Sequence, residues 1–174
     1  MFNRIGHSGI YRAGRGAGNY APCARGLALA AWVVLSAGCA RPADIGARGS
    51  AGAIAVSHAV AWGVADVKAV TVGMEISNEG EVADTLVAVT SPAGGATLHT
   101  EVPGQGMRPI SVLPLPRRSA IRIGRGLHVM IESLQKVPAV GATIPVTLRF
   151  AGAGAMELSV PVMQYSEALS ALGE

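Results

Sequence analysis

Apolar and polar residues alternate in short runs along most of the chain after residue 53, a pattern typical of β-strands with one buried face. The expected strands are 69–77, 85–90, 96–101, 120–123, 127–131, 143–150 and 155–162. Turn-forming residues, such as Asn78-Glu79-Gly80, separate these runs. Seven to nine short strands, with turn signals about every 8–12 residues, predict an all-β fold, an antiparallel β-sandwich.

Helical patterns are short in the part of the chain that follows residue 39. A single helical turn is expected over 133–139 and a short helix over 166–172. Three prolines lie in the middle of the chain, at Pro109, Pro114 and Pro116. Because proline cannot donate a hydrogen bond to a β-ladder, these positions predict strand edges and connections rather than central strands.

The first 39 residues follow a different pattern, in which a basic stretch precedes a short apolar run and then small residues. The stretch holds four arginines and no acidic residue. The apolar run from Gly26 to Gly38 has 13 residues, which is too short to span a hydrocarbon core of ~30 Å as a helix. Residues 1–39 are therefore expected to be an export signal peptide rather than a permanent membrane anchor or a buried helix.

The end of this segment, Leu35-Ser36-Ala37-Gly38-Cys39, resembles the lipobox of bacterial lipoproteins. The resemblance implies that Cys39 becomes a lipidated N-terminus that holds the protein at a membrane surface. One position departs from the pattern, since a lipobox usually has its large aliphatic residue three positions before the cysteine, where this chain has Ser36. The alternative is cleavage followed by release of the domain. Both outcomes predict an extracytoplasmic location.

Composition divides the remaining chain into three parts. Residues 40–52 are small and Gly-rich, which predicts a flexible linker. Residues 53–163 hold the alternating runs and are expected to form the β-sandwich domain, and residues 164–174 to form a C-terminal tail. Without the four arginines of the signal, the chain has 10 basic and 11 acidic residues and no basic stripe interleaved with aromatic residues. This balance argues against a nucleic-acid partner.

The sequence His128-Val129-Met130 lies within an expected strand and is the first candidate for chemistry. Residues two apart on a strand point to the same face, so the imidazole of His128 and the thioether of Met130 are expected to lie together. His99 and Met107 lie upstream in segments that are also expected to be extended. Imidazole nitrogen and thioether sulfur form a soft ligand set that suits Cu(I) better than Zn²⁺, Mg²⁺ or Ca²⁺.

Each of these residues also has an ordinary structural interpretation. A strand face that is simply buried, with a hydrogen-bonded imidazole, would explain His128 and Met130 without any metal. His58 is expected to be a surface polar residue just before the first strand, although it could join a metal site. From the residues alone, the copper site and the buried strand face both remain open. The other methionines of the expected domain are predicted to fill the core: Met74, Met156 and Met163.

The stretch from about Val56 to Val162 resembles the PCu(A)C family of periplasmic and surface copper chaperones. The similarity covers nearly the whole expected domain, and its landmarks occur in the family's order. The resemblance implies a cupredoxin-like, immunoglobulin-like Greek-key sandwich. The matching segments are Ile76–Gly80, Ala83–Val87, Ser91-Pro92-Ala93, Leu98-His99, Gly106-Met107-Arg108-Pro109, Gly126–Met130 and Thr143–Phe150.

The family's copper motif is a histidine, then a methionine, then a His-x-Met. The resemblance therefore implies Cu(I) bound by the imidazoles of His99 and His128 and the thioethers of Met107 and Met130. Seven residues separate His99 from Met107 and twenty separate Met107 from His128, so the first spacing is shorter than the family's. Shortening a surface loop has a small entropic cost, although it can change the reach of Met107. Gln105 stands where the family often has a second methionine.

The resemblance further implies an extracytoplasmic copper chaperone, a carrier rather than an enzyme. Its acceptor would be the copper centre of a terminal cytochrome oxidase or an assembly factor, and the chaperone is expected to be a monomer. One alternative is a non-metal surface sandwich that binds a protein partner, which would have the same fold. Another is a copper redox enzyme, which would more often add a third imidazole; the sequence has no common hydrolase or nucleotide-binding motif in a suitable context.

Overall fold

The computed structural model describes residues 45–174. The expected export signal and Cys39 lie outside the described residues. Residues 45–174 form eleven β-strands, a short 3₁₀ helix at Ala65–Val67 and one α-helix, α1, at Tyr165–Leu172. The strands are β1 Ala47–Ala51, β2 Ile54–Val64, β3 Ala69–Asn78, β4 Asp84–Thr90, β5 Gly95–Val102, β6 Gly106–Ile110, β7 Leu113–Leu115, β8 Ser119–Ile123, β9 Leu127–Glu132, β10 Thr143–Phe150 and β11 Gly154–Pro161.

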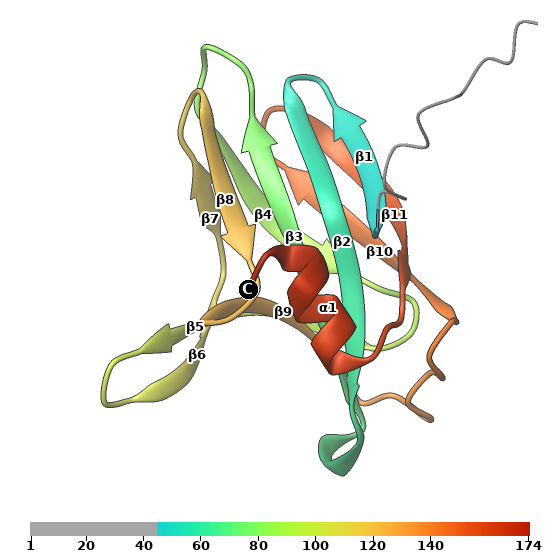
Figure 1. The fold of residues 1–174 in the computed structure, drawn as a ribbon. Coiled ribbons are helices and arrows are strands. Elements are labelled where there is room, and N and C mark those ends of the chain that lie inside the picture. Colours follow the sequence, from blue (N-terminus) through green and yellow to red (C-terminus); the bar gives the residue numbers. More distant parts are fainter. Residues whose placement is uncertain (1–44) are drawn as a thin grey trace, which may run out of the picture. The chain divides into compact units, whose positions relative to one another are not determined.

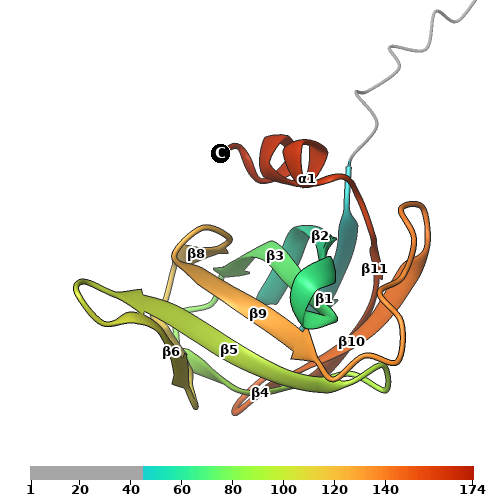
Figure 2. The ribbon, with the colours of Figure 1, turned by 90° about the horizontal axis from the view of Figure 1, so that it is seen from below.

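The strands form two antiparallel sheets that pack on each other as a sandwich (Figures 1 and 2). The larger sheet has the strand order β1-β2-β3-β9-β5-β6. The long strand β3 is shared, because its first half pairs with β9 and its second half with β8. The smaller sheet has the order β11-β10-β4-β7. This architecture confirms the predicted all-β sandwich.

The core between the sheets is built from aliphatic side chains that recur at every second position. In β10, Ile144, Val146 and Leu148 are buried, whereas the residues between them are more exposed. The larger sheet supplies Val129 and Ile131 of β9, both fully buried. Full burial of each such side chain stabilises the fold by roughly 1.5–3 kcal/mol, so the alternating pattern is a major contribution to the packing of the two sheets.

Helix α1 packs on the outer face of the larger sheet, over β2 and β3 (Figure 2). Val60 and Trp62 of β2 point to this face and form a second apolar cluster with Leu172 of the helix. Gly73 of β3 makes room for the helix, since a Cβ atom there would lie 2.5 Å from a methyl carbon of Leu172. The rings of Trp62 and Tyr165 meet edge to face, with their centroids 5.9 Å apart. The helix is thus fixed to the sheet by apolar contacts.

Three local expectations were wrong. Residues 47–51, assigned to a flexible linker, form strand β1, which pairs with β2 at the edge of the larger sheet. Residues 133–139 contain no helical turn, and Ser133 has φ +59°, a left-handed conformation that a right-handed helix does not use. His58 lies inside β2 rather than before the first strand, at a bulge where the register with β3 shifts between Ser57 and Val60.

Other expectations are confirmed. The helix at 166–172 is present as α1. Pro109 lies in β6 and Pro114 in β7, each the edge strand of its sheet, where a missing N–H leaves no gap in a ladder. Met74 and Met156 are buried in the core, and Met163 packs against the cluster beneath α1. No helix in the described part of the chain is long and apolar enough to cross a membrane.

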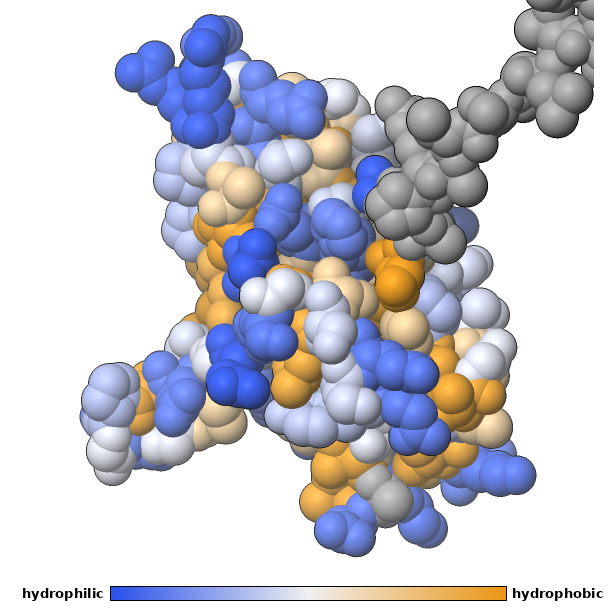
Figure 3. Space-filling model, viewed as in Figure 1, coloured by the Kyte–Doolittle hydropathy of each residue, from blue (hydrophilic) through white to orange (hydrophobic). Residues whose placement is uncertain are grey.

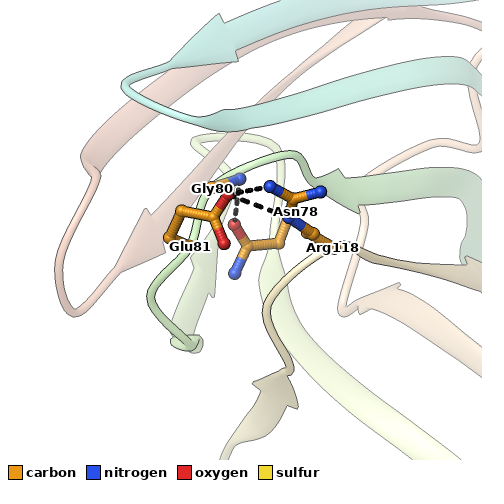
Figure 4. Close-up of polar contacts among 4 residues, drawn as sticks. All are labelled: Asn78, Gly80, Glu81 and Arg118. Atoms are coloured by element: carbon orange, nitrogen blue, oxygen red, sulfur yellow. Dashed lines mark hydrogen bonds and ion pairs between the residues drawn. The ribbon is translucent and has the colours of Figure 1, made fainter.

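A buried amide joins the end of β3 to the neighbouring segments (Figure 4). The side chain of Asn78 is only 2% exposed. Its Nδ2 donates to the carbonyl oxygens of Val82 and Leu115, at 2.9 and 3.0 Å, and its Oδ1 accepts from the N–H of Gly80, at 3.0 Å. One side chain therefore satisfies three backbone groups. The ion pair between Arg118 and Glu81 lies beside it at the exposed surface.

Replacing Asn78 with alanine is expected to lower the free energy of unfolding by about 1–3 kcal/mol, because the buried carbonyl of Leu115 loses its donor. Urea denaturation measures this change. The control is Glu81→Gln, which weakens the neighbouring exposed ion pair and is expected to change stability little. Similar losses from the two substitutions would contradict the importance of the buried amide.

Candidate metal centre

The two candidate histidines lie side by side on neighbouring strands. In the antiparallel pairing of β5 with β9, His99 is directly opposite His128. The centroids of the two imidazole rings are 6.0 Å apart, and the rings are inclined by 75°. Directly opposite residues of antiparallel strands project from the same face of a sheet. Both rings, each half-buried, therefore lie on one face of the larger sheet.

This face is turned away from the core. Next to the histidines, Leu98 and Val129 are directly opposite each other and are both buried in the core. Successive residues of a strand point to opposite faces, so His99 and His128 point outward. The alternation that builds the core therefore also sets the direction of both imidazoles.

Met130 lies on the same strand and the same face as His128. It is two residues further along β9, and its side chain is half-buried. In the sheet it stands between Thr97 of β5 and Thr71 of β3. The strand and the shared face that the spacing predicts for His128 and Met130 are both present.

Met107 is on this face as well, at the outer edge of the sheet. It is directly opposite Glu101 of β5, and Glu101 is two residues beyond His99. The thioether side chain is 41% exposed. The hairpin that carries it, β5–β6, projects from the sheet (Figures 1 and 3), and Gly106 at its turn has φ +71°, which glycine adopts without strain.

All four predicted ligand residues thus share the outer face of β9, β5 and β6. They occupy three successive outward positions, with Met130 at one end, the two histidines in the middle and Met107 at the other end. Successive outward positions on a strand are about 6.8 Å apart, so the two thioethers flank the histidine pair. We call this set of His99, Met107, His128 and Met130 the His/Met face.

One atom of the His/Met face has no partner. The Nδ1 atom of His99 is buried and makes no hydrogen bond within the described structure. A buried polar atom without a partner is rare in proteins and is destabilising, so such an atom calls for an explanation. A lone pair kept free for a metal ion is one explanation that fits the neighbouring imidazole and thioethers.

The donor set of this region limits which metal it could hold. Within residues 45–174 no group of three or more His, Cys, Asp and Glu residues is placed to bind a metal ion. The two imidazoles alone would leave Zn²⁺ short of its usual ligands. A metal here would need the thioethers, and thioether sulfur favours Cu(I).

The apo protein is expected to lose stability as the pH falls through the imidazole range. Partial burial lowers the pKa of His128 below its ordinary value of 6.5, and the positive charge that His99 can carry lowers it further. Below pH ~6.5 the unfolded chain then binds a proton at His128 more readily than the folded protein does. The free energy of unfolding should therefore fall as the pH drops through this range and stay level above it.

Urea denaturation of the metal-free protein between about pH 7.5 and pH 5 checks this expectation. The variant His128→Gln removes the titrating ring and should show a weaker dependence on pH. An identical pH dependence in the wild type and in His128→Gln would contradict the assignment to His128.

One residue beside the His/Met face, Glu101, was not assigned to the site from the sequence. Glu101 is exposed and lies on the same face, opposite Met107, and its N–H donates to the carbonyl of Gly126 at 2.6 Å. Gly126 has φ +78°. Because residues two apart on a strand point to the same face, the spacing of Glu101 from His99 could have predicted that they share this face. The pairing with Gly126 depends on a contact between strands, which the sequence does not show.

His58 is not part of the His/Met face. It lies on β2, and β3 separates β2 from β9. Its Nδ1 is 3.0 Å from the hydroxyl of Ser57, and its ring borders a small cavity beside Glu75 and Arg122. Together with His99 and His128 it would make a group of three histidines, and the described residues form no such group.

Comparisons with known proteins agree with the fold. The LpqE-like lipoprotein family matches residues 54–162, and no curated protein matches the chain. The copper-bound PCuAC domain from PmoF2 has a TM-score of 0.60 and 21% identity, covering 67% of this chain and 97% of that one. The apo PCuAC domain from PmoF1 has a TM-score of 0.58 and 25% identity, covering 67% of this chain and 98% of that one.

A third solved structure, CuI-DR1885 from Deinococcus radiodurans, has a TM-score of 0.55 and 21% identity, covering 68% of this chain and 81% of the other. The family match spans more than half of the chain and coincides with the sandwich described above. The chain therefore belongs to the LpqE-like lipoprotein family and has the fold of the PCu(A)C domains.

Proposed function

We propose that this protein is an extracytoplasmic copper chaperone that binds one Cu(I) ion at the His/Met face and passes it to an acceptor protein. The observation that carries the proposal is the register of β5 with β9. It puts His99 directly opposite His128, with a methionine on either side of the pair on the same face. A soft ligand set of this kind suits Cu(I).

Two similar structures support the choice of metal. One is a copper-bound PCuAC domain and another is a Cu(I) form of DR1885. The local chemistry of this chain points the same way, because the His/Met face supplies imidazole nitrogen and thioether sulfur, a soft ligand set that suits Cu(I). Copper is the cargo of the protein under this proposal, and the fold does not depend on it, since the core lies between the sheets and away from the His/Met face.

The position of Met107 supports a carrier role rather than an enzymatic one. Its thioether is exposed at the edge of the sheet, whereas His99, His128 and Met130 are half-buried. A ligand that is open to solvent can be replaced by a ligand of an approaching protein, which would let the ion leave one bond at a time. The acceptor proposed is the copper centre of a terminal cytochrome oxidase or an assembly factor of that oxidase.

Lipidation of Cys39 would place this exchange near a membrane. Seven residues, 40–46, separate Cys39 from the first strand, so a fully extended chain reaches no more than about 28 Å from the anchor to Ala47. A monomeric domain on such a tether stays close to the extracytoplasmic surface. This location suits an acceptor that is itself bound to the membrane.

Titration of the purified protein with Cu(I), in competition with a chromophoric Cu(I) chelator, tests the proposal. The wild type is expected to take up one equivalent tightly, and the double variant His99→Ala/Met130→Leu is expected to lose it. Equal binding by the two proteins would exclude the His/Met face as the site. No binding by either would leave a surface sandwich whose partner is a protein rather than a metal.

A further inference from the structure

Glu174 follows helix α1 and its C-cap residue, and its side chain contacts the turn that precedes β9. At the end of α1, Gly173 adopts φ +72°, and its N–H bonds to the carbonyl of Ser170. The N–H of Glu174 bonds to the carbonyl of Leu169 at 3.0 Å. This capping pattern closes the helix and fixes the direction in which Glu174 leaves it.

The carboxylate of Glu174 binds the turn between β8 and β9. Its two oxygens accept from the N–H of Arg125, at 3.1 and 3.2 Å. They also lie directly over Gly124, where an added Cβ atom would be 2.6 Å from one carboxylate oxygen. Gly124 is buried, and the Glu174 carboxylate covers it on the solvent side of the turn.

The same turn leads straight into the His/Met face. The N–H of Gly124 donates to the carbonyl of Leu127, and His128 is the next residue. On the other side, the carbonyl of Gly126 accepts from the N–H of Glu101, which is two residues from His99. The turn therefore fixes the start of β9 and joins it to the end of β5.

The helix behind Glu174 is a firm support for this contact. Leu172 packs on Trp62 and above Gly73, within the apolar cluster that holds α1 to β2 and β3. By contrast, the turn that Glu174 contacts contains two glycines, Gly124 and Gly126. Glycine has the largest backbone conformational freedom of any residue. A carboxylate that directly follows a firmly packed helix can thus restrain a turn whose glycines allow many conformations.

Resting on the proposed function, we infer that Glu174 is a positioning residue for His128: helix α1 holds the β8–β9 turn through the Glu174 carboxylate and so sets the imidazole for Cu(I). Binding sites need their ligands held within about 0.5 Å of the productive geometry. Loss of residues that directly orient a metal ligand lowers affinity about 10- to 100-fold. Glu174 acts through the backbone of the turn, so a smaller effect of about three- to tenfold is expected.

A double-mutant cycle tests this inference, with Cu(I) affinity as the readout. Glu174→Ala removes the carboxylate, and Gly124→Ala displaces it, since the atoms nearest to the added methyl all belong to Glu174. Each single variant is expected to weaken Cu(I) binding about three- to tenfold. The double variant is expected to be no weaker than Glu174→Ala, because Gly124→Ala then has nothing left to displace.

Two further variants separate positioning from general stability. Glu174→Gln keeps an oxygen acceptor for the N–H of Arg125 and should restore most of the affinity. Glu167→Ala removes an acidic side chain from helix α1 itself and should leave the affinity unchanged. In the metal-free protein, hydrogen exchange at the Arg125 amide should speed up in Glu174→Ala, and the ring resonances of His128 should shift.

The possible results distinguish this inference from the proposed function. Wild-type Cu(I) affinity in Glu174→Ala, or losses that add in the double variant, would overturn the positioning role and leave the copper site intact. If the wild type bound no Cu(I), the proposed function would fail and the positioning role would fail with it. Equal losses of Cu(I) affinity in Glu174→Ala and Glu174→Gln, with thermal midpoints lowered alike, would show a general loss of stability and would overturn the positioning role.

Discussion

Replacing His128 with alanine is expected to lower the affinity for Cu(I) by more than about 100-fold. Mutating groups that only orient a metal ligand already lowers affinity by about 10- to 100-fold, so loss of the ligand itself should exceed that range. His128 is the residue most surrounded by other candidate ligands, with His99 directly across the strand pair and Met130 two residues on. Competition with a chromophoric Cu(I) chelator measures the change.

His58, the histidine of the domain that lies outside the His/Met face, provides the matched control. His58→Ala removes an imidazole from β2, which β3 separates from β9, and should leave Cu(I) affinity within about twofold of the wild type. Thermal unfolding of both variants checks that the fold is retained. If His58→Ala weakened binding as much as His128→Ala, the site could not be confined to the His/Met face.

Replacing both Met130 and Met107 with leucine is expected to abolish tight Cu(I) binding while leaving the fold in place. Methionine and leucine have similar volumes, so the double substitution should change the free energy of unfolding by less than about 1.5 kcal/mol per site. The two imidazoles that remain can still bind a metal, but without soft sulfur ligands they lose their preference for Cu(I). Of the single variants, Met130→Leu should have the larger effect, because Met130 is half-buried whereas Met107 is 41% exposed.

Met163→Leu serves as the control for removing a thioether. Met163 packs against the cluster beneath α1, and its substitution should alter neither Cu(I) affinity nor stability by much. Chelator competition measures Cu(I) affinity and urea denaturation measures stability. Both are applied to the two single variants, the double variant and Met163→Leu. Unchanged Cu(I) affinity in Met107→Leu/Met130→Leu would exclude the thioethers as ligands and would mean that other residues hold the ion.

Strands β10 and β11 were predicted correctly because each has one buried face, whereas β3 was predicted although its first half is buried on both faces. In β10 and β11, alternation between core and surface leaves a period of two in the sequence. Strand β2, whose middle Ala59–Trp62 is also buried on both faces, was not among the expected strands. The core lies on one side and α1 on the other, so no alternation remains.

Strand β1 was also not among the expected strands. Its residues, Ala47–Ala51, are small or polar and have the composition of a linker. They form a strand by pairing with β2, and Gly49 also fits closely against Leu158 and Met156 of β11, where an added Cβ atom would be 2.8 Å from either side chain. This fit depends on a partner about 110 residues away in the chain, so a local pattern cannot reveal it.

The candidate site shows the same division between local and long-range information. That His128 and Met130 share a face follows from their spacing on one strand. That His99 lies opposite His128 depends on the register of β5 with β9, which composition and periodicity leave open. The hydrogen bond between the Glu174 carboxylate and the turn before β9 depends on where α1 packs. The sequence shows only a polar residue after a short helix.

X-ray absorption at the copper edge of the Cu(I)-loaded protein is the most direct test of the His/Met face. The expected spectrum is that of Cu(I) bound by two sulfur and two nitrogen ligands, with one sulfur contribution lost in Met130→Leu and one nitrogen contribution lost in His99→Ala. A spectrum with nitrogen and oxygen ligands alone, unchanged by either substitution, would show that copper binds elsewhere on the protein.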